Sequence, residues 1–269
     1  MKIGKNALIK LLEATKREQS VNGKTQPQVM GCILFHDEDT TETVSMVKDG
    51  KTSLARFSVK GSEGESCTIP VPDIDRLIGV LKYHGDVVQL LTDGIGTKVV
   101  VKSKGKQTTL IGGANSKAFP HSSSTIEEWY GMSCGRLQQL SHGGTYTTAD
   151  GQVISAKWTA IVKATDLYDA LRCDGMNGQK LNRYTFTLDG EKLSVSVGDH
   201  FKGQTVSELS EITGEDFSVT LEGGLENVVK HYSNDVYIHF LDFREYEQGI
   251  RAIFSFDNGD LLIQAGVIE

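Results

Sequence analysis

The chain has 269 residues, and its 28 basic and 35 acidic residues give a formal charge of −7. That length suits one large domain or two ordinary ones, and 38% hydrophobic residues suffice for a packed core, which excludes wholesale disorder. No stretch of roughly 20 apolar residues occurs, which argues against a membrane span. The start has no secretion-signal pattern, which argues against a secreted protein. No C-x-x-C pair occurs, which argues against a zinc ribbon.

Four segments have the apolar spacing of amphipathic helices, at i, i+3, i+4 and i+7. The predicted helices cover about 6–19, 71–84, 164–174 and 222–233. Pro72 suits the first turn of the second helix, because proline lacks the amide hydrogen that would be unpaired there. Thr165 is expected to cap the third helix.

Short strands separated by glycine turns are predicted between these helices. The pair Asp189-Gly190 lies between two alternating segments and predicts a tight hairpin. The predicted strands cover 29–35, 54–59, 87–91, 97–102, 107–111, 183–188, 192–197, 236–241, 250–256 and 261–265.

The order of these elements indicates an internal repeat. Two helices with their strands occur in 1–112 and return in the same order in 153–269, although the two halves share little sequence. We therefore expect an α+β protein with two similar domains, each with two helices packed on antiparallel sheets. Residues 113–152 would connect the domains, and we expect part of this long segment, near 125–140, to form a short helix or strand.

Catalytic and metal-binding patterns are weak in this sequence. Residues 131–135 match G-x-S-x-G, so a hydrolase that uses Ser133 is one alternative, but the motif needs a strand before it and a helix after it. The Gly-Lys-Thr triplets at 23–25 and 50–52 lack the upstream glycine of a phosphate loop, and the histidines show no H-x-x-x-H spacing. We expect no enzyme activity, no metal and no cofactor.

Each predicted helix carries at least one cation away from its apolar stripe, whereas acidic residues gather in loops such as 37–42 and 208–216. Charged outer faces are common on helices, yet cations arranged this way also suit contacts to DNA phosphates. The candidate DNA-binding residues are Lys10, Lys16, Arg17, Arg76, Lys82, Arg172 and Lys230.

Several short stretches are similar to one known family. These are ALIKLLEA at 7–14, WTAIVK at 158–163 with DLYDAL at 166–171, SNDVYI at 233–238 and QAGVIE at 264–269. They resemble DNA polymerase sliding clamps of the proliferating-cell nuclear antigen type, which archaea, eukaryotes and phages use. The sequence departs from that pattern at Tyr237, where clamps often have proline, and in its long connector.

The resemblance implies a head-to-tail homotrimer that closes a ring of six domains, with edge strands of neighbouring chains paired. The helices would line the hole, and their cations would face the phosphates of double-stranded DNA without reading its sequence. Such a ring would tether a DNA polymerase and confer processivity in DNA replication, after a clamp loader has opened it. We expect an intracellular location, in the cytoplasm or nucleoid, or in the host cytoplasm if the protein is viral.

Partner proteins would dock short peptides on the outside of such a ring. The residues that the resemblance implies for this pocket are Val44, Met46, Ile126, Trp129, Ala265, Val267 and Ile268. A viral structural protein is a further alternative, because it could share the same strand-rich, glycine-punctuated composition.

Overall fold

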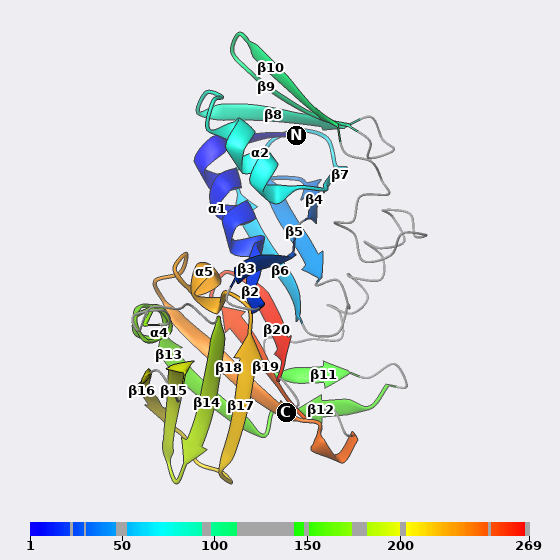
Figure 1. The fold of residues 1–269 in the computed structure, drawn as a ribbon. Coiled ribbons are helices and arrows are strands. Elements are labelled where there is room, and N and C mark those ends of the chain that lie inside the picture. The colour runs from blue at the N-terminus through cyan, green and yellow to red at the C-terminus, as the bar shows by residue number, and fades with distance from the viewer. Residues whose placement is uncertain are drawn as a thin grey trace. The chain divides into compact units, whose positions relative to one another are not determined.

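The computed structural model describes residues 1–21, 24–29, 31–46, 53–92, 98–111, 143–147, 151–173, 182–199, 203–246 and 249–266. These residues form two compact units (Figure 1). No helix in the described ranges is long and apolar enough to span a bilayer.

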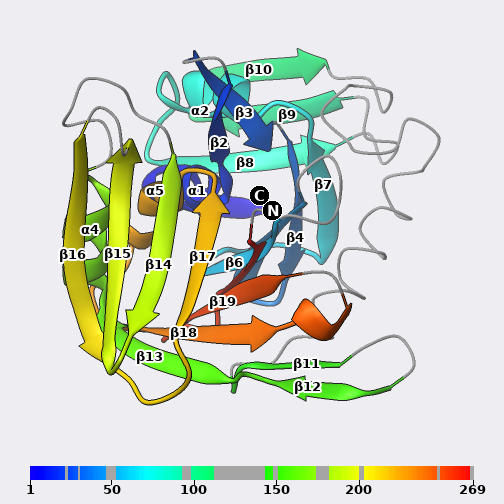
Figure 2. The same ribbon diagram turned by 60° about the horizontal axis from the view of Figure 1, so that its bottom comes forward.

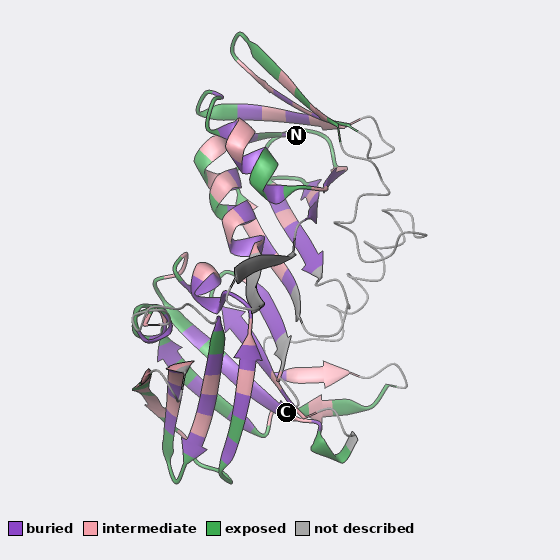
Figure 3. Ribbon diagram, in the orientation of Figure 1, coloured by how far each residue is buried: buried purple, intermediate pink, exposed green. Residues whose placement is uncertain are grey.

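The described part of unit 1 is built from two antiparallel sheets and two helices (Figure 1). Its elements are β1 (Lys2–Gly4), α1 (Lys5–Thr15), β4 (Cys32–Asp37), β5 (Thr40–Met46), β6 (Ser53–Lys60), β7 (Cys67–Val71), α2 (Ile74–Leu81), β8 (Val87–Thr92), β9 (Lys98–Ser103) and β10 (Lys106–Ile111). Strands β1, β8, β9 and β10 pair in that order, and so do β6, β5, β4 and β7. Leu8, Leu77 and Val101 are fully buried. Figure 3 shows buried residues along both helices and along the strands of this unit.

Unit 2 repeats this plan. Its elements are β13 (Trp158–Lys163), α4 (Ala164–Leu171), β14 (Arg183–Asp189), β15 (Lys192–Asp199), β16 (Gly203–Glu211), β17 (Phe217–Glu222), α5 (Leu225–Val229), β18 (Asp235–Asp242), η1 (Arg244–Tyr246), β19 (Ile250–Phe256) and β20 (Leu261–Ala265). Strands β13, β18, β19 and β20 pair in that order. Strands β16, β15, β14 and β17 also pair in order and lie side by side in Figure 2.

The two units therefore share one topology, in which β13 to β20 stand in the same sheet positions as β1 and β4 to β10. Each unit runs strand, helix, four strands, helix, three strands, apart from a small ribbon of β2 (Arg17–Val21) and β3 (Lys24–Val29) after α1. The predicted α+β fold of two similar domains is confirmed. The predicted boundaries stay predictions, because most of 113–152 lies outside the described residues.

A second ribbon begins within the predicted connector and ends just after it. Strand β11 (Thr145–Thr147) pairs antiparallel with β12 (Val153–Ser155). Gly144 precedes this ribbon with a φ of 73°, and a Cβ at this position would lie 2.5 Å from the His239 ring. Only glycine fits there without displacing the imidazole. The helix or strand expected near 125–140 lies outside the described residues.

Helix α1 ends earlier than its periodicity predicts. The hydroxyl of buried Thr15 donates to the Leu11 carbonyl at 2.8 Å and lies 2.7 Å from the Thr43 hydroxyl of β5. Lys16 then turns into an extended conformation with ψ of 135°. The Thr15 hydroxyl thus contacts both its own helix and the neighbouring strand β5, and these contacts hold the last turn where the helix ends. Arg17 consequently lies in β2 rather than on the helix, which corrects its predicted place.

Helix α2 starts later than predicted, at Ile74. The Asp73 carboxylate accepts the Arg76 amide at 2.8 Å and caps the helix. Val71 belongs to β7, because a residue before proline avoids the helical region. Pro72 therefore lies before the cap and not in the first turn.

The helices of unit 2 are also shorter than predicted. Helix α4 begins directly after β13, whose Lys163 pairs with Asp235, so Lys163 and not Thr165 is the N-cap residue. Helix α5 has only five residues, because Glu222 still pairs with Arg183 in the sheet and Gly223 follows with a φ of 100°. Periodicity located these helices, but capping and strand pairing fixed their ends.

A network of four charges joins three segments of unit 2. Lys157 lies 2.7 Å from Glu215 and 3.5 Å from Asp242, and Arg244 donates from Nε to Asp242 at 2.8 Å. The hydrogen bonds from Arg244 lower the pKa of Asp242 to about 2, against the opposing effect of desolvation. The ionised Asp242 therefore stabilises the fold above the carboxyl pKa of the unfolded chain, near 3.9, and this contribution is lost as pH falls through about 2.

We predict that Asp242→Asn lowers the free energy of unfolding at pH 7 by about 2 kcal/mol, and that wild type and variant converge as the pH falls towards 2. Denaturant titration at several pH values measures this. Exposed Asp189 provides the control, Asp189→Asn. A gap between wild type and Asp242→Asn that stays constant from pH 7 to 2 would show that Asp242 acts through packing alone.

Candidate nucleic-acid interface and partner surface

Four of the predicted cations, Lys10, Lys16, Arg76 and Lys82, lie on or at the ends of two helices that contact each other, α1 and α2 (Figure 1). Lys10, Arg76 and Lys82 are exposed. Lys16 is less available, because its Nζ lies 2.9 Å from an Asp75 carboxylate oxygen and its side chain is only 26% exposed. Arg76 also reaches the Ile111 carbonyl, at 3.4 Å. Lys10 and Lys82 thus carry the least compensated positive charge of this helix pair.

In unit 2 the predicted cations are Arg172 and Lys230, and both are exposed. Arg172 forms an ion pair with Asp169 at 3.1 Å, and its guanidinium lies 5.9 Å from the centre of the Tyr168 ring. No carboxylate within the described ranges lies at ion-pair distance from Lys10, Lys82 or Lys230. The side chain of Arg17 lies outside the described residues.

The four helices within the described residues share one feature at their ends. The C-cap residues of α1, α2, α4 and α5 are Lys16, Lys82, Arg172 and Lys230. A cation at this position is favourable by itself, because the last carbonyls of a helix carry partial negative charge. One cation therefore lies at the corresponding end of each described helix. Cations placed this way suit contacts to phosphates, which do not depend on the base sequence.

The residues predicted for partner binding are only partly described. Val44 is fully buried on β5, so it packs in the core of unit 1 and offers no exposed side chain, contrary to the expected pocket. Met46 and Ala265 end β5 and β20, where only the backbone is described. Ile126, Trp129, Val267 and Ile268 lie outside the described residues, as does Ser133 of the G-x-S-x-G match.

An exposed apolar pair on unit 2 was missed by the sequence reasoning. Ile161 and Tyr237 face each other across β13 and β18 and are 51% and 41% exposed. The Tyr237 ring stacks on His239, with ring centres 6.3 Å apart. Strand alternation is the sequence signal that could have found Ile161. Trp158, Ala160 and Val162 point inward, so Ile161 between them points outward. Large apolar side chains grouped on a surface are typical of binding sites.

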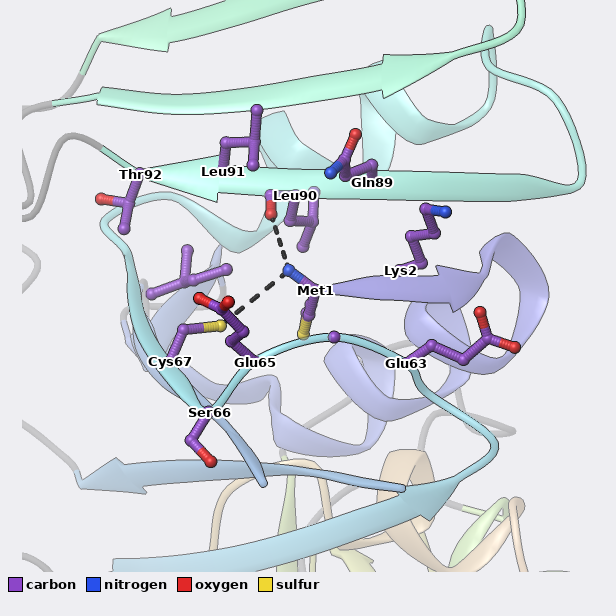
Figure 4. Close-up of a pocket in the computed structure, with 12 residues that line it drawn as sticks. Met1, Lys2, Glu63, Glu65, Ser66, Cys67, Gln89, Leu90, Leu91 and Thr92 are labelled. Atoms are coloured by element: carbon purple, nitrogen blue, oxygen red, sulfur yellow. Dashed lines mark hydrogen bonds between the residues drawn. The ribbon is translucent and has the colours of Figure 1, made fainter. Parts of the chain in front are cut away.

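A cavity of about 510 Å³ lies in unit 1 between β1, β8 and the segment before β7 (Figure 4). Glu63, Glu65 and Cys67 line one side, and Gln89 and Leu91 line the other. No group of three histidines, cysteines or carboxylates in the described part of the chain could hold a metal ion. The thiols of Cys32, Cys67 and Cys173 are free, and burial strongly raises the pKa of Cys32.

Comparison with solved structures identifies the fold. The beta subunit of DNA polymerase III from Thermotoga maritima matches 100% of this chain with a TM-score of 0.61 and 12% identity. That from Streptococcus pneumoniae matches 100% with a TM-score of 0.63 and 12% identity. The DNA polymerase sliding clamp of Bacillus subtilis matches 100% with a TM-score of 0.60 and 13% identity. The chain has the sliding-clamp fold.

This chain covers 65%, 64% and 64% of the length of those three clamp chains. No protein-family model and no curated protein matches its sequence. The three clamps are bacterial, so the finer resemblance to the proliferating-cell nuclear antigen type stays a prediction. The predicted sliding-clamp resemblance itself is confirmed at the level of fold.

Proposed function

We propose that this chain is the subunit of a ring that encircles double-stranded DNA and tethers a DNA polymerase to it. The observation that carries the proposal is the clamp fold over the whole chain, with one topology repeated in both units. Three chains of two units would close a ring of six. The chain would act by holding other enzymes in place, and no reaction is assigned to it.

The sheet edges support head-to-tail assembly. Strands β10 and β16 each end their sheet, with a partner on one side only among the described strands. Each carries one strongly exposed aliphatic residue, Ile111 at 67% and Val206 at 63%. An unpaired edge with apolar side chains is a liability in a monomer, and pairing β10 of one copy with β16 of the next removes it.

The helix cations support contact with DNA. Lys10, Lys82 and Lys230 are exposed and have no described acidic partner, so they could meet phosphates without first breaking an ion pair. Contacts of this kind are weak, salt-sensitive and independent of sequence. A ring that must slide needs contacts of this type, because a specific contact would hold it at one place.

Partner docking in this proposal uses the exposed pair Ile161 and Tyr237 on unit 2. An aromatic and an aliphatic side chain side by side suit the apolar anchors of a short peptide from a polymerase or a clamp loader. The tail at 264–269 would complete the site, as the family resemblance implies.

A topological experiment tests the proposed function without a cognate polymerase. The labelled protein is incubated with nicked circular plasmid at low salt, moved to high salt and separated by gel filtration. We expect some protein to stay with the circular plasmid and to leave when a restriction enzyme linearises it, because a ring slides off free ends. Equal retention on circular and linear DNA contradicts encirclement, because a ring would leave the linear DNA at its free ends.

A further inference from the structure

The sheet of β1, β8, β9 and β10 has an outer face that the proposed function does not use. Its register aligns Lys2, Gln89, Lys102 and Gln107 in one row across the four strands. Val88 and Leu90 of β8 point the other way and are fully buried, so this row lies on the side of the sheet away from the core. Figure 4 shows Lys2, Gln89 and Leu91 projecting to the same side of their strands.

This outer face is basic along β9. Residues 98–111 contain four lysines and no carboxylate, and Lys98 and Lys102 are the two that lie on the same side of β9 as Val100. Lys98 is exposed and Lys102 partly exposed, and neither has a carboxylate partner within the described ranges. Such a concentration of one sign is notable in a chain with a formal charge of −7.

The repeat provides an internal comparison. In unit 2 the strand equivalent to β9 is β19, which contains no lysine and one cation, Arg251. The Arg251 guanidinium lies 4.8 Å from the centre of the Phe243 ring. The exposed or partly exposed lysines of β9 therefore have no counterpart in β19.

The spacing on β9 specifies the shape of a ligand. Lys98, Val100 and Lys102 alternate with the buried Val99 and Val101, so they lie along one face. Four residues of strand separate the two lysines by about 13 Å. An extended peptide has the same rise per residue. A peptide with carboxylates at positions i and i+4 would place them opposite Lys98 and Lys102, with an aliphatic residue at i+2 opposite Val100.

A peptide fits this face better than a nucleic acid. Single strands are held by aromatic or arginine side chains on which bases stack, and β1, β8, β9 and β10 contain neither. Glu63 and Glu65 line the cavity beside Lys2, so the uncompensated charge lies on the β9 side. We propose that the outer face along β9 docks an extended acidic segment of a partner protein, with Lys98 and Lys102 holding its carboxylates around Val100.

A pair of synthetic peptides tests this proposal on the full chain. The probe is fluorescein-labelled Ser-Glu-Thr-Leu-Thr-Glu-Ser, and its isomer Ser-Leu-Thr-Glu-Glu-Thr-Ser has the same composition with the carboxylates adjacent. By fluorescence anisotropy at low salt, we expect the probe to bind more tightly than the isomer. The double variant Lys98→Gln, Lys102→Gln should lose about fivefold in affinity for the probe, as expected for two exposed ion pairs.

The matched control is Lys60→Gln with Lys163→Gln, which removes two exposed lysines from other strands. Equal binding of the two peptides, or an equal loss in both double variants, overturns the proposal, because either result means nonspecific attraction to anions. If labelled oligo-dT binds more tightly than the probe peptide, and its binding depends on Lys98 and Lys102, the partner is a nucleic acid and not an acidic peptide. None of these measurements requires a ring, so their failure leaves the proposed encirclement of DNA standing.

Discussion

Replacing Val206 with glutamate is expected to convert an assembly of three chains into monomers of 29.4 kDa. Val206 is 63% exposed on the edge strand β16, where the proposed ring places the neighbouring chain. A carboxylate that loses its hydration in that contact costs about 3 kcal/mol or more, which weakens association about a hundredfold. Size-exclusion chromatography with light scattering at micromolar concentration measures the mass directly.

Val153 supplies the control for this substitution. It is a valine of nearly equal exposure, 60%, on the small ribbon strand β12 and not on β10 or β16. Val153→Glu should leave the mass at three times that of one chain. A wild-type protein that is already monomeric would refute the head-to-tail assembly, and a trimer that persists in Val206→Glu would place the contact on another edge.

Removing the three cations without described acidic partners is expected to weaken duplex binding while the ring stays intact. In the triple variant Lys10→Ala, Lys82→Ala, Lys230→Ala, each chain loses contacts that would release counterions from phosphates. We expect affinity for a labelled duplex to fall about tenfold or more at low salt, with a shallower dependence of log affinity on log salt. Fluorescence anisotropy over a range of salt concentrations gives both quantities.

The control removes the same number of exposed or partly exposed lysines from strands of unit 1, in Lys60→Ala, Lys98→Ala, Lys102→Ala. If the helices contact DNA and the β9 face binds an acidic peptide, this variant should bind duplex as well as wild type does. If instead the control weakens duplex binding as much as the helix variant does, the strand surface and not the helices contacts DNA.

Periodicity in the sequence located the four described helices because their apolar stripes are unambiguous. Leu8 and Leu77 are fully buried, as their spacing predicts. Helix ends were less predictable, since they depend on partners elsewhere in the chain. Thr15 ends α1 partly through Thr43, and β13 fixes the start of α4 through its pairing with Asp235. Neither partner is visible in a local window of sequence.

The candidate site was predictable in part for a similar reason. Helical cations away from an apolar stripe are exposed, which places Lys10, Lys82 and Lys230 correctly at the surface. Pairing of Lys16 with Asp75 joins residues far apart in the chain and could not be read from spacing. The outward positions of Tyr237 and Lys102 follow from strand alternation, but which strands lie beside them requires the register.

The repeat of one topology in both units has an evolutionary consequence. In an oligomer of identical single-domain subunits, a mutation appears on every domain, so no face can specialise alone. Two copies of one topology in one polypeptide leave each half free to diverge, as the lysines of β9, which have no counterpart in β19, illustrate. A ring built from such halves would carry two alternating kinds of binding surface, so two different partner proteins could bind it at the same time without competing.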